Sequence, residues 1–538
     1  MLFDTLDELK NRLKVFEEKV FRKEEIIALK DREIESKNLK IDQQFQQIER
    51  LKEELKLALL RQFGRKSERY EAPPEQMSLF DEPELEIPKP EVHEPIEIPS
   101  HTRVKSRGKR APLPEGLERE ERVYELPASE LVGPNGEVFE RIGEEVSEQL
   151  DIIPADVKVI RHIRVKYACK THEELGVKIA PMPNQMLPKT MAAPGLLAHM
   201  VQAKYEHHLP LYRQESIWQG FDVDIPRNSM VRWTNELGEK LQPLVDRLFV
   251  AIKQTGYVNA DETAVVVVKD PNKKPEADSH TGRMWVYLNE SVGTFFDYQS
   301  SRGSVHPKDR LSDFTGYLQV DGYSAYDSLP ADQITQVGCM AHVRRKFVDV
   351  KKLAGKFKTP TVDHVLKEIQ RLYEWEAQFK KDGLTPEEIW RLRQEKSKPI
   401  LEKLHQYLAE IHPKTPPKGK LGQAIGYALN HWTVCLNYLN DGRLAIDNNA
   451  AERAIKPFAV GRKNWLFAQN TTGAKASANL YSLVQSAKTQ GLNVFRYLKF
   501  LFEEFPNADT EAKLDDLLPH RLAKTQPELK KSQDPEDD

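Results

Sequence analysis

An unbroken heptad repeat near the N-terminus constrains the folding of this chain more than any other feature of its sequence. Apolar residues occupy every seventh position in the series Leu6, Leu13, Val20, Ile27, Ile34, Ile41, Ile48 and Leu55. A helix with this repeat carries one narrow apolar stripe, and two such helices bury it by winding around each other. The repeat predicts a coiled coil over residues 1–63 that joins two copies of the chain in a homodimer.

The companion stripe of the heptads is polar in its middle, which weakens pairing there. It is apolar at Leu2, Leu9, Phe16 and Leu51 but reads Lys23, Lys30, Lys37 and Gln44 between them. The alternative to a homodimer is therefore a single amphipathic helix that packs on the folded part of its own chain.

The composition limits the remaining 475 or so residues to several soluble domains, at roughly 150 residues per domain. The 80 Lys and Arg nearly balance the 83 Asp and Glu, so binding to nucleic acid would need local basic patches. The three cysteines are too widely spaced for a disulfide framework, which favours a reducing compartment. No run approaches the roughly 20 apolar residues of a membrane span. We expect a cytoplasmic, nucleoid-associated protein without a membrane partner.

Two segments before residue 250 are candidates for DNA contact. Residues 64–122 are rich in proline and end in a basic run that includes Arg107, Lys109 and Arg110, as is typical of a linker that can also bind phosphates. Residues 123–190 alternate apolar and polar positions, with a strand expected over 157–167. Residues 191–250 predict short helices in a helix-turn-helix-like layout, and its candidate DNA contacts are Arg227, Asn228 and Arg232. A packing module without DNA contact remains the alternative.

Carboxylates inside apolar strands mark the segment that carries chemistry. Asp261 and Glu262 interrupt a strand over 257–268, and Asp321 ends a later strand, after two further strands over 283–287 and 294–298. A buried carboxylate costs free energy unless it is paired or metal-bound. These acids therefore predict a functional site, although Asp297 and Asp327 also lie near strand ends.

A third carboxylate follows a helical stretch over residues 345–440, in which Trp375, Trp390 and Trp432 are the expected core anchors. Asp447 or Asn448 suits the start of the next helix, and Glu452 lies in its first turns. Two aspartates and a glutamate can hold two divalent cations for phosphoryl transfer. Spacing alone leaves the choice among the acids open, and Glu262 is an equally possible ligand.

Several long motifs together resemble the insertion sequence 66 family of bacterial transposases, and the resemblance runs through almost the whole chain. They are Phe63–Glu68, Lys204-Tyr205, Leu209–Gln214, Ala260–Thr263, Gly282–Tyr287, Asp321-Gly322-Tyr323 and Asp447–Phe467. The resemblance implies an RNase H-like catalytic domain of the DDE type, with Asp261, Asp321 and Glu452 as the matching acids. It also implies two bound Mg²⁺ (or Mn²⁺) ions, and an all-α insertion before the glutamate-bearing helix.

The expected organisation is thus a multidomain α/β protein. Its units are a coiled coil (1–63), a linker (64–122), a degenerate zinc-finger-like β module (123–190), helix-turn-helix-like helices (191–250), the catalytic domain in two parts (251–344 and 441–490) around the helical insertion (345–440), and a C-terminal helical segment with an acidic tail (491–538). Arg453, Lys456, Arg462 and Lys463 flank Glu452 and are candidate phosphate contacts.

Cysteine usage departs from the family pattern, in which two Cys-x-x-Cys pairs precede the helix-turn-helix. Only Cys169 and His172 remain here, and two ligands cannot close a structural zinc site. We expect this module to fold without zinc. The Cys339-x-x-His342 pair resembles a signature of some DDE transposases, but we expect a buried cysteine and a satisfied histidine without a metal.

The sequence therefore predicts a transposase that cuts the ends of its element and joins the freed 3′-hydroxyls to target DNA. Its partners would be double-stranded DNA, a second copy of the chain and the small accessory proteins that the family resemblance implies. Two alternatives stand beside it: a catalytically inert transposase relic that still binds DNA, and a coiled-coil scaffold with no nucleic-acid role. The aspartates at strand ends argue against the scaffold.

Overall fold

The computed structural model describes residues 157–163, 166–168, 177–179, 182–269, 279–355, 357 and 359–531, together with eight residues between Lys30 and Lys52. Those eight residues are all helical, and the heptad residue Ile48 is half exposed among them. The chain divides into two compact units, of which one comprises Met1–Glu68 and Arg164–Lys531 and the other Arg69–Ile163 and Ser532–Asp538. All the elements below belong to the first unit.

A mixed sheet forms the centre of this unit, with the strand order β5-β4-β3-β6-β7. The strands are β3 (Tyr257–Lys269), β4 (His280–Asn289), β5 (Gly293–Gln299), β6 (Gly316–Gln319) and β7 (Ile334–Val337). β3, β4 and β5 form an antiparallel meander, whereas β6 and β7 run parallel to β3 on its other side. A short strand, β8 (Ala468–Asn470), pairs in parallel with the end of β3. The expected strands over 257–268, 283–287 and 294–298 are confirmed.

The edge strand β5 is covered by a helix that also satisfies its backbone. Ser482 and Ser486 lie on α14 (Thr471–Thr489), and their hydroxyls accept hydrogen bonds of 2.8 Å from the amides of Phe296 and Thr294. An uncovered edge strand would offer these amides to another chain. Ser482 and Ser486 therefore close the edge of the sheet.

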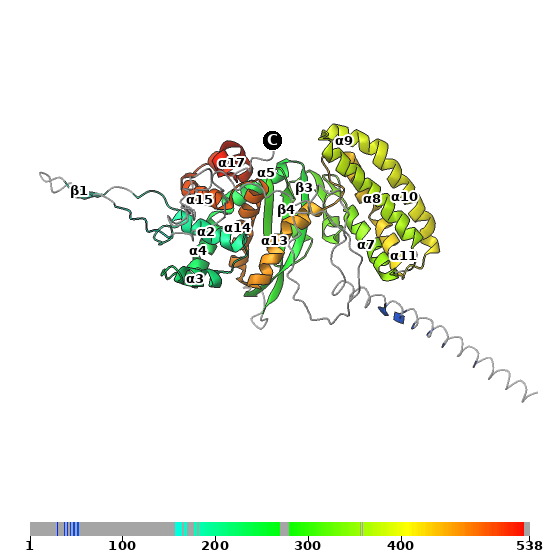
Figure 1. Ribbon diagram of the computed structural model, residues 1–538, viewed down its shortest axis with the longest axis horizontal. Coiled ribbons are helices and arrows are strands. Elements are labelled where there is room, and N and C mark those ends of the chain that lie inside the picture. The colour runs from blue at the N-terminus through cyan, green and yellow to red at the C-terminus, as the bar shows by residue number, and fades with distance from the viewer. Residues whose placement is uncertain are drawn as a thin grey trace, which may run out of the picture. The chain divides into compact units, whose positions relative to one another are not determined.

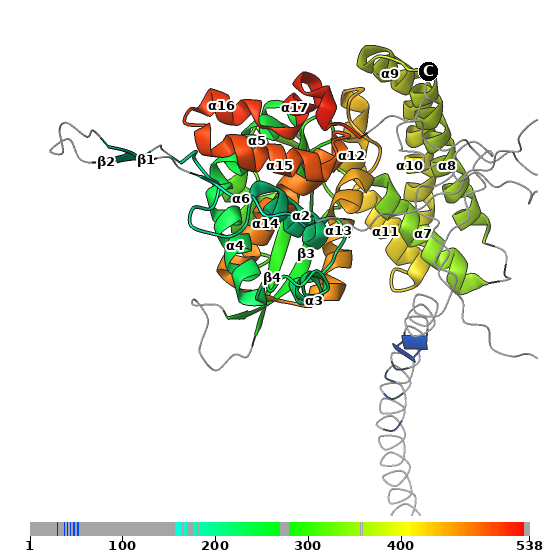
Figure 2. The ribbon, with the colours of Figure 1, turned by 60° about the vertical axis from the view of Figure 1, so that its left-hand side comes forward.

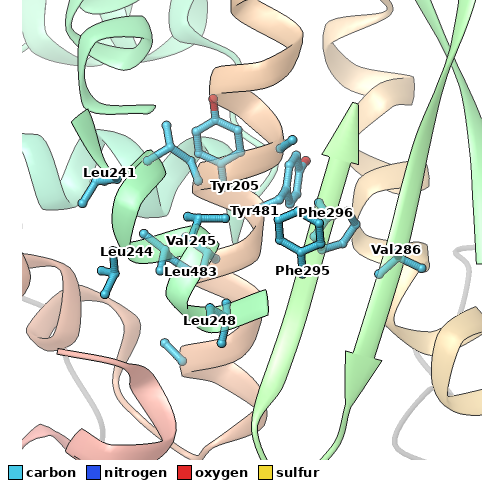
Figure 3. Packing of buried hydrophobic residues seen from close by; sticks show 14 of the residues in the cluster. Tyr205, Leu241, Leu244, Val245, Leu248, Val286, Phe295, Phe296, Tyr481 and Leu483 are labelled. Atoms are coloured by element: carbon cyan, nitrogen blue, oxygen red, sulfur yellow. The ribbon is translucent and has the colours of Figure 1, made fainter. Parts of the chain in front are cut away.

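Helices that precede the sheet in the sequence and helices that follow it form one hydrophobic core with it. Figure 3 shows Leu248 of α5 (Gln242–Gln254) near Phe295 of β5, and Tyr481 of α14 beside Phe296, all in one buried cluster. Burial of large aromatic side chains stabilises the contact because each removes about 150 to 250 Å² from water. The helix α15 (Val494–Glu504) packs on α2 (Pro194–Tyr205), and Figure 1 shows them side by side with α14.

The helical stretch before Glu452 has a core of its own. Its main helices are α7 (Met340–Ala354), α8 (Pro360–Lys381), α10 (Lys398–Ile411) and α11 (Lys420–Asn430). They stand apart from the sheet in Figure 2. Trp432 is buried in this core, but the expectation for Trp390 was wrong: its side chain is exposed, because the short helix α9 (Pro386–Leu392) buries none of its residues. The strand β7 ends at Val337, and α7 already begins at Met340.

The helices before the sheet follow the expected layout, whereas the strand before them does not. α2 is followed by α3 (Leu211–Gln219) and α4 (Arg227–Lys240), with a turn at Gly220. Residues 157–163 form no strand, because no described segment pairs with them, and β1 (Lys166–Ala168) pairs instead with β2 (Val177–Ile179). Among the described residues, no helix is both long and apolar enough to cross a membrane.

Candidate active site

Asp261 and Asp321 are brought together by the register of two parallel strands. Asn259 of β3 is paired with Gln319 of β6, so the register, continued by two residues, sets Asp321 opposite Asp261. Neighbouring strands lie about 4.8 Å apart, and residues in register point to the same face of a sheet. The two aspartates therefore share one face at the point where β6 ends.

Glu452 reaches the same region from α13 (Asn449–Trp465), which packs against β3 and β4. Asn448 stands before the helix and is fully buried. Its side-chain amide donates to the Ala260 carbonyl at 2.8 Å, and its Oδ1 accepts from Asn259 at 3.2 Å. Asp447 or Asn448 was expected as the helix cap; Asp447 Oδ1 accepts from the Asn449 amide at 3.1 Å, whereas the Asn448 side chain makes no cap hydrogen bond. It instead ties the start of the helix to the residue before Asp261.

The pKa of Asp261 reflects both its burial and the nearby acids. The pKa of Asp261 is raised to about 7, chiefly by burial and also by the charges of Asp321, Glu262 and Glu452, against a hydrogen bond from the Glu262 amide that lowers it. A carboxylate surrounded by other carboxylates is stabilised by a cation. The donor set consists of the hard carboxylate oxygens that Mg²⁺ prefers.

Glu452 is turned toward basic side chains of α7. Its carboxylate lies 3.3 Å from Arg345 Nη2 and 3.7 Å from His342 Nε2. Within the described part of the chain, no three His, Cys, Asp or Glu side chains are gathered closely enough to hold a metal ion. The carboxylate oxygens of these acids suit a divalent cation by their chemistry, but the described side chains are not arranged as a ligand shell, and Glu452 is paired with Arg345.

Two of the other acids considered from the sequence are paired with arginines, and the third is exposed. The side chain of Glu262 is only 2% exposed, and its carboxylate is paired with Arg302. Asp297 is buried and accepts two hydrogen bonds of 2.8 Å from Arg310. Asp327 is exposed in a short helical turn after Asp321. The geometry favours Asp261 over Glu262 as the free carboxylate of β3.

Arg302 was not identified from the sequence, although it links the two strands that bear the aspartates. Its guanidinium pairs with Glu262 and lies 3.6 Å from the centre of the Tyr323 ring. Tyr323 Oη donates to the Arg302 carbonyl at 2.8 Å, and the Tyr323 amide donates to Asp321 Oδ1 at 3.0 Å. Arg302 comes from a Ser-Ser-Arg-Gly loop without periodicity, so no sequence signal pointed to it.

Cys339 and His342 lie at the junction of sheet and insertion. Cys339 is buried, burial raises the pKa of its thiol to about 11, and its Sγ accepts a hydrogen bond from the Asn448 amide. His342 was expected to have its hydrogen-bonding groups paired, but its buried Nδ1 has no hydrogen-bond partner. Burial also lowers the pKa of His342.

The expected DNA-contacting residues occupy different surroundings. Arg227, Asn228 and Arg232 are exposed on one face of α4, and Lys456 and Lys463 are exposed on α13. Arg453 is exposed and pairs with Glu290 at 2.9 Å. The Arg462 guanidinium donates to the Ala264 carbonyl and so joins α13 to β3. Arg107, Lys109 and Arg110 lie outside the described residues.

Replacing Asp261 by asparagine should stabilise the metal-free protein at high pH. The folded state binds the Asp261 proton more tightly than the unfolded chain, because the pKa of the carboxyl is about 7 in the folded protein and 3.8 in the unfolded chain. Its contribution to stability is complete below pH 3.8 and is lost as the pH rises through 7. We expect the free energy of unfolding of Asp261→Asn to gain roughly 2 to 4 kcal/mol on wild type between pH 4 and pH 8.

The measurement is urea unfolding in EDTA across this pH range, with the exposed Asp327→Asn as the matched control. A difference between Asp261→Asn and wild type that stays constant with pH would show that Asp261 does not carry a raised pKa.

Comparison with known families identifies the class of protein. A sequence profile described as "Transposase IS66 family" matches residues 189–476, more than half of the chain. Profiles described as "Transposase C of IS166 homeodomain" and "IS66 C-terminal element" match residues 50–122 and 482–520. The matches define a transposase, and the chain belongs to the IS66 family.

Its relatives include three uncharacterized proteins of Sinorhizobium fredii. The protein y4jD is 35% identical over 422 residues, which cover 76% of this chain and 81% of the relative. The protein y4qI is 33% identical over 434 residues, covering 76% and 78%, respectively. The protein y4hP is 28% identical over 406 residues, covering 71% and 72%.

The expectation that the chain has no structural zinc was wrong. A profile described as "zinc-finger binding domain of transposase IS66" matches residues 135–171. The expectation came from counting Cys-x-x-Cys pairs, whereas the profile is matched by the pattern of the whole segment, and histidine and carboxylate side chains can also ligate zinc. Cys169 and His172 lie outside the described residues.

Proposed function

We propose that this transposase cleaves the ends of its insertion sequence and transfers the freed 3′-hydroxyls to target DNA, in an RNase H-like domain with Asp261, Asp321 and Glu452 as its acids. The observation that supports the proposal is the β3–β6 register, whose last pair, Asn259 with Gln319, lies two residues before Asp261 and Asp321. The strand order, an antiparallel meander followed by two parallel strands, agrees with such a domain.

Each acid has a distinct contribution in this mechanism. Asp261 and Asp321 present carboxylate oxygens from adjacent strands, and Glu452 supplies a third carboxylate once its side chain leaves Arg345. Two divalent cations held by these residues would activate the attacking oxygen and stabilise the leaving oxygen of each in-line transfer. The Asn448 bond to Ala260 and the Arg302 pairing with Glu262 hold α13 and the two strands in place.

DNA would be held by basic side chains on two helices. One set is exposed on α4 and is suited to contact the bases at the element's end: Arg227, Asn228 and Arg232. The other set is exposed on α13 and is suited to bind DNA phosphates beside the acids: Arg453, Lys456 and Lys463. Two element ends need two active sites, which a homodimer through the heptad repeat would supply. The half-exposed Ile48 supports that pairing. Small accessory proteins of the element would join this assembly at the nucleoid.

Strand cleavage and joining on a duplex that carries the element's own ends tests the proposal. We expect nicked and joined products with the full-length protein in Mg²⁺ or Mn²⁺, and no product in EDTA. One observation favours a second candidate, an inert DNA-binding relic: Glu452 is engaged by Arg345. Binding of the ends without cleavage, even with the accessory proteins present, would establish the relic.

Lys463→Ala should weaken DNA binding in proportion to one lost phosphate contact. Lys463 is exposed and lies near the end of α13. Each phosphate neutralised by a cationic side chain contributes about 0.9 to the slope of log K against log salt. We expect the slope to fall by about that amount, as measured by fluorescence anisotropy from 50 to 300 mM salt.

The matched control is Lys499→Ala, which removes an exposed lysine from α15. Equal slopes for Lys463→Ala, Lys499→Ala and wild type would contradict a phosphate contact at α13.

A further inference from the structure

Two large apolar side chains project into solvent where α13 ends. Leu466 is 63% exposed and Phe467 is 45% exposed. Exposed apolar residues are ordinary when they are scattered singly, but an adjacent pair at the end of a helix that also bears the candidate Glu452 requires an explanation. These two residues, called the apolar tip below, belong to a motif that the proposed chemistry leaves without a role.

The backbone of the apolar tip is strained and held at both ends. Leu466 has φ 66° and ψ −49°, and the Phe467 amide donates to the Trp465 carbonyl at 2.8 Å. This is a γ-turn of the rare form, which a non-glycine residue adopts only when the surroundings enforce it. Trp465 packs edge-on against Phe458 at 5.5 Å, and Ala468 begins β8 beside β3. The tip is therefore a fixed projection.

Two lysines of α13, Lys456 and Lys463, called the lysine track below, lie between Glu452 and the apolar tip along the helix. On an α-helix, Lys456 and Lys463 lie within about 40° of Glu452 around the axis, because they follow it by four and eleven residues. Both lysines are exposed. The rise from Glu452 to Lys463 is about 16 Å, close to five base-pair steps of a DNA strand at about 3.4 Å each.

These observations together point to a ligand that is both anionic and planar. The lysine track attracts a phosphate backbone, and the apolar tip offers an aromatic ring with no charge to repel it. Apolar side chains that enter DNA separate stacked bases, and an unstacked base gains free energy on an aromatic face.

We propose that the apolar tip is a binding site for an unstacked base of the DNA end, with Phe467 as its stacking partner and Leu466 as the wedge that separates the base from its neighbour. This inference rests on the proposed function, since the acids of the same helix fix which stretch of DNA meets the tip. The base lies about four to seven nucleotides from the cleaved bond, as the length of the lysine track requires.

The test uses the full-length protein and a duplex of the element's end in which 2-aminopurine replaces one base at a time, with Ca²⁺ in place of Mg²⁺. We expect fluorescence to rise at least about threefold at one position four to seven nucleotides from the cleaved bond. Phe467→Ala should abolish this rise and weaken binding about tenfold, while Phe467→Trp should retain both. An abasic site at the same position should restore the affinity of Phe467→Ala, because no base then needs to be unstacked.

The matched control is Phe357→Ala, which removes an exposed phenylalanine from the helical insertion. Binding and cleavage by wild type without a fluorescence rise, or equal behaviour of Phe467→Ala and Phe357→Ala, would overturn the base site alone. Loss of a protein partner by Phe467→Ala with an unchanged DNA response would also overturn it. A wild-type protein that binds no DNA end would overturn the proposed function together with this inference.

Discussion

Asp261→Asn, Asp321→Asn and Glu452→Gln should each lower strand cleavage and joining by at least about 10³-fold while DNA binding stays within about twofold of wild type. Each substitution preserves the shape of the side chain and removes the negative charge that a divalent cation requires. The loss is large because charge neutralisation during phosphoryl transfer depends on all three carboxylates together. The measurement is single-turnover cleavage of the element's end in Mg²⁺, with affinity measured separately.

Two controls make this result specific to the three acids. Asp327→Asn changes an exposed carboxylate shortly after Asp321 and should leave the rate unchanged. Glu262→Gln tests the other acid of β3, and we expect it to act through stability, because Glu262 is buried against Arg302. Full activity in Asp261→Asn together with a dead Glu262→Gln would reverse the assignment on β3.

The strands of the sheet were predictable from the sequence because each has a strong local pattern. The strands β3, β4 and β5 are apolar runs separated by polar or glycine-containing turns, and a charged residue inside such a run is conspicuous. The meander and the later strand ending before Asp321 then limit which acids can meet.

The contacts that hold the site together were not predictable, because each depends on tertiary packing. Arg302 pairs with Glu262 across 40 residues of sequence, and Asn448 bonds to Ala260 across 188. Asn448 looked like a helix cap because asparagine favours that position, yet burial of its side chain against β3 provided better partners. Trp390 failed as a core anchor for a similar reason: residue type alone does not tell whether a short helix packs against the core.

Asn448→Ala should shift the position of Glu452 while leaving its carboxylate group unchanged. The substitution removes the 2.8 Å bond to the Ala260 carbonyl and leaves that buried oxygen without the Asn448 donor. We expect the free energy of unfolding to fall by about 2 kcal/mol, the cost of a lost buried hydrogen bond. We expect the cleavage rate to fall about 100-fold, because a displacement of about 1 Å in a ligand-bearing helix is enough for such a loss.

The comparison that isolates positioning uses two further variants. Asn448→Asp keeps the size of the side chain but cannot donate to Ala260 when ionised, so its rate should fall like that of alanine. Asn449→Ala changes the next residue, whose side chain donates to Asp447 outside the β3 contact, and should keep most of the rate. Equal losses in Asn448→Ala and Asn449→Ala would mean that the start of α13 tolerates no change at all. A loss confined to Asn448 variants, at unchanged DNA affinity, would mean that the bond to β3 sets where Glu452 stands relative to Asp261.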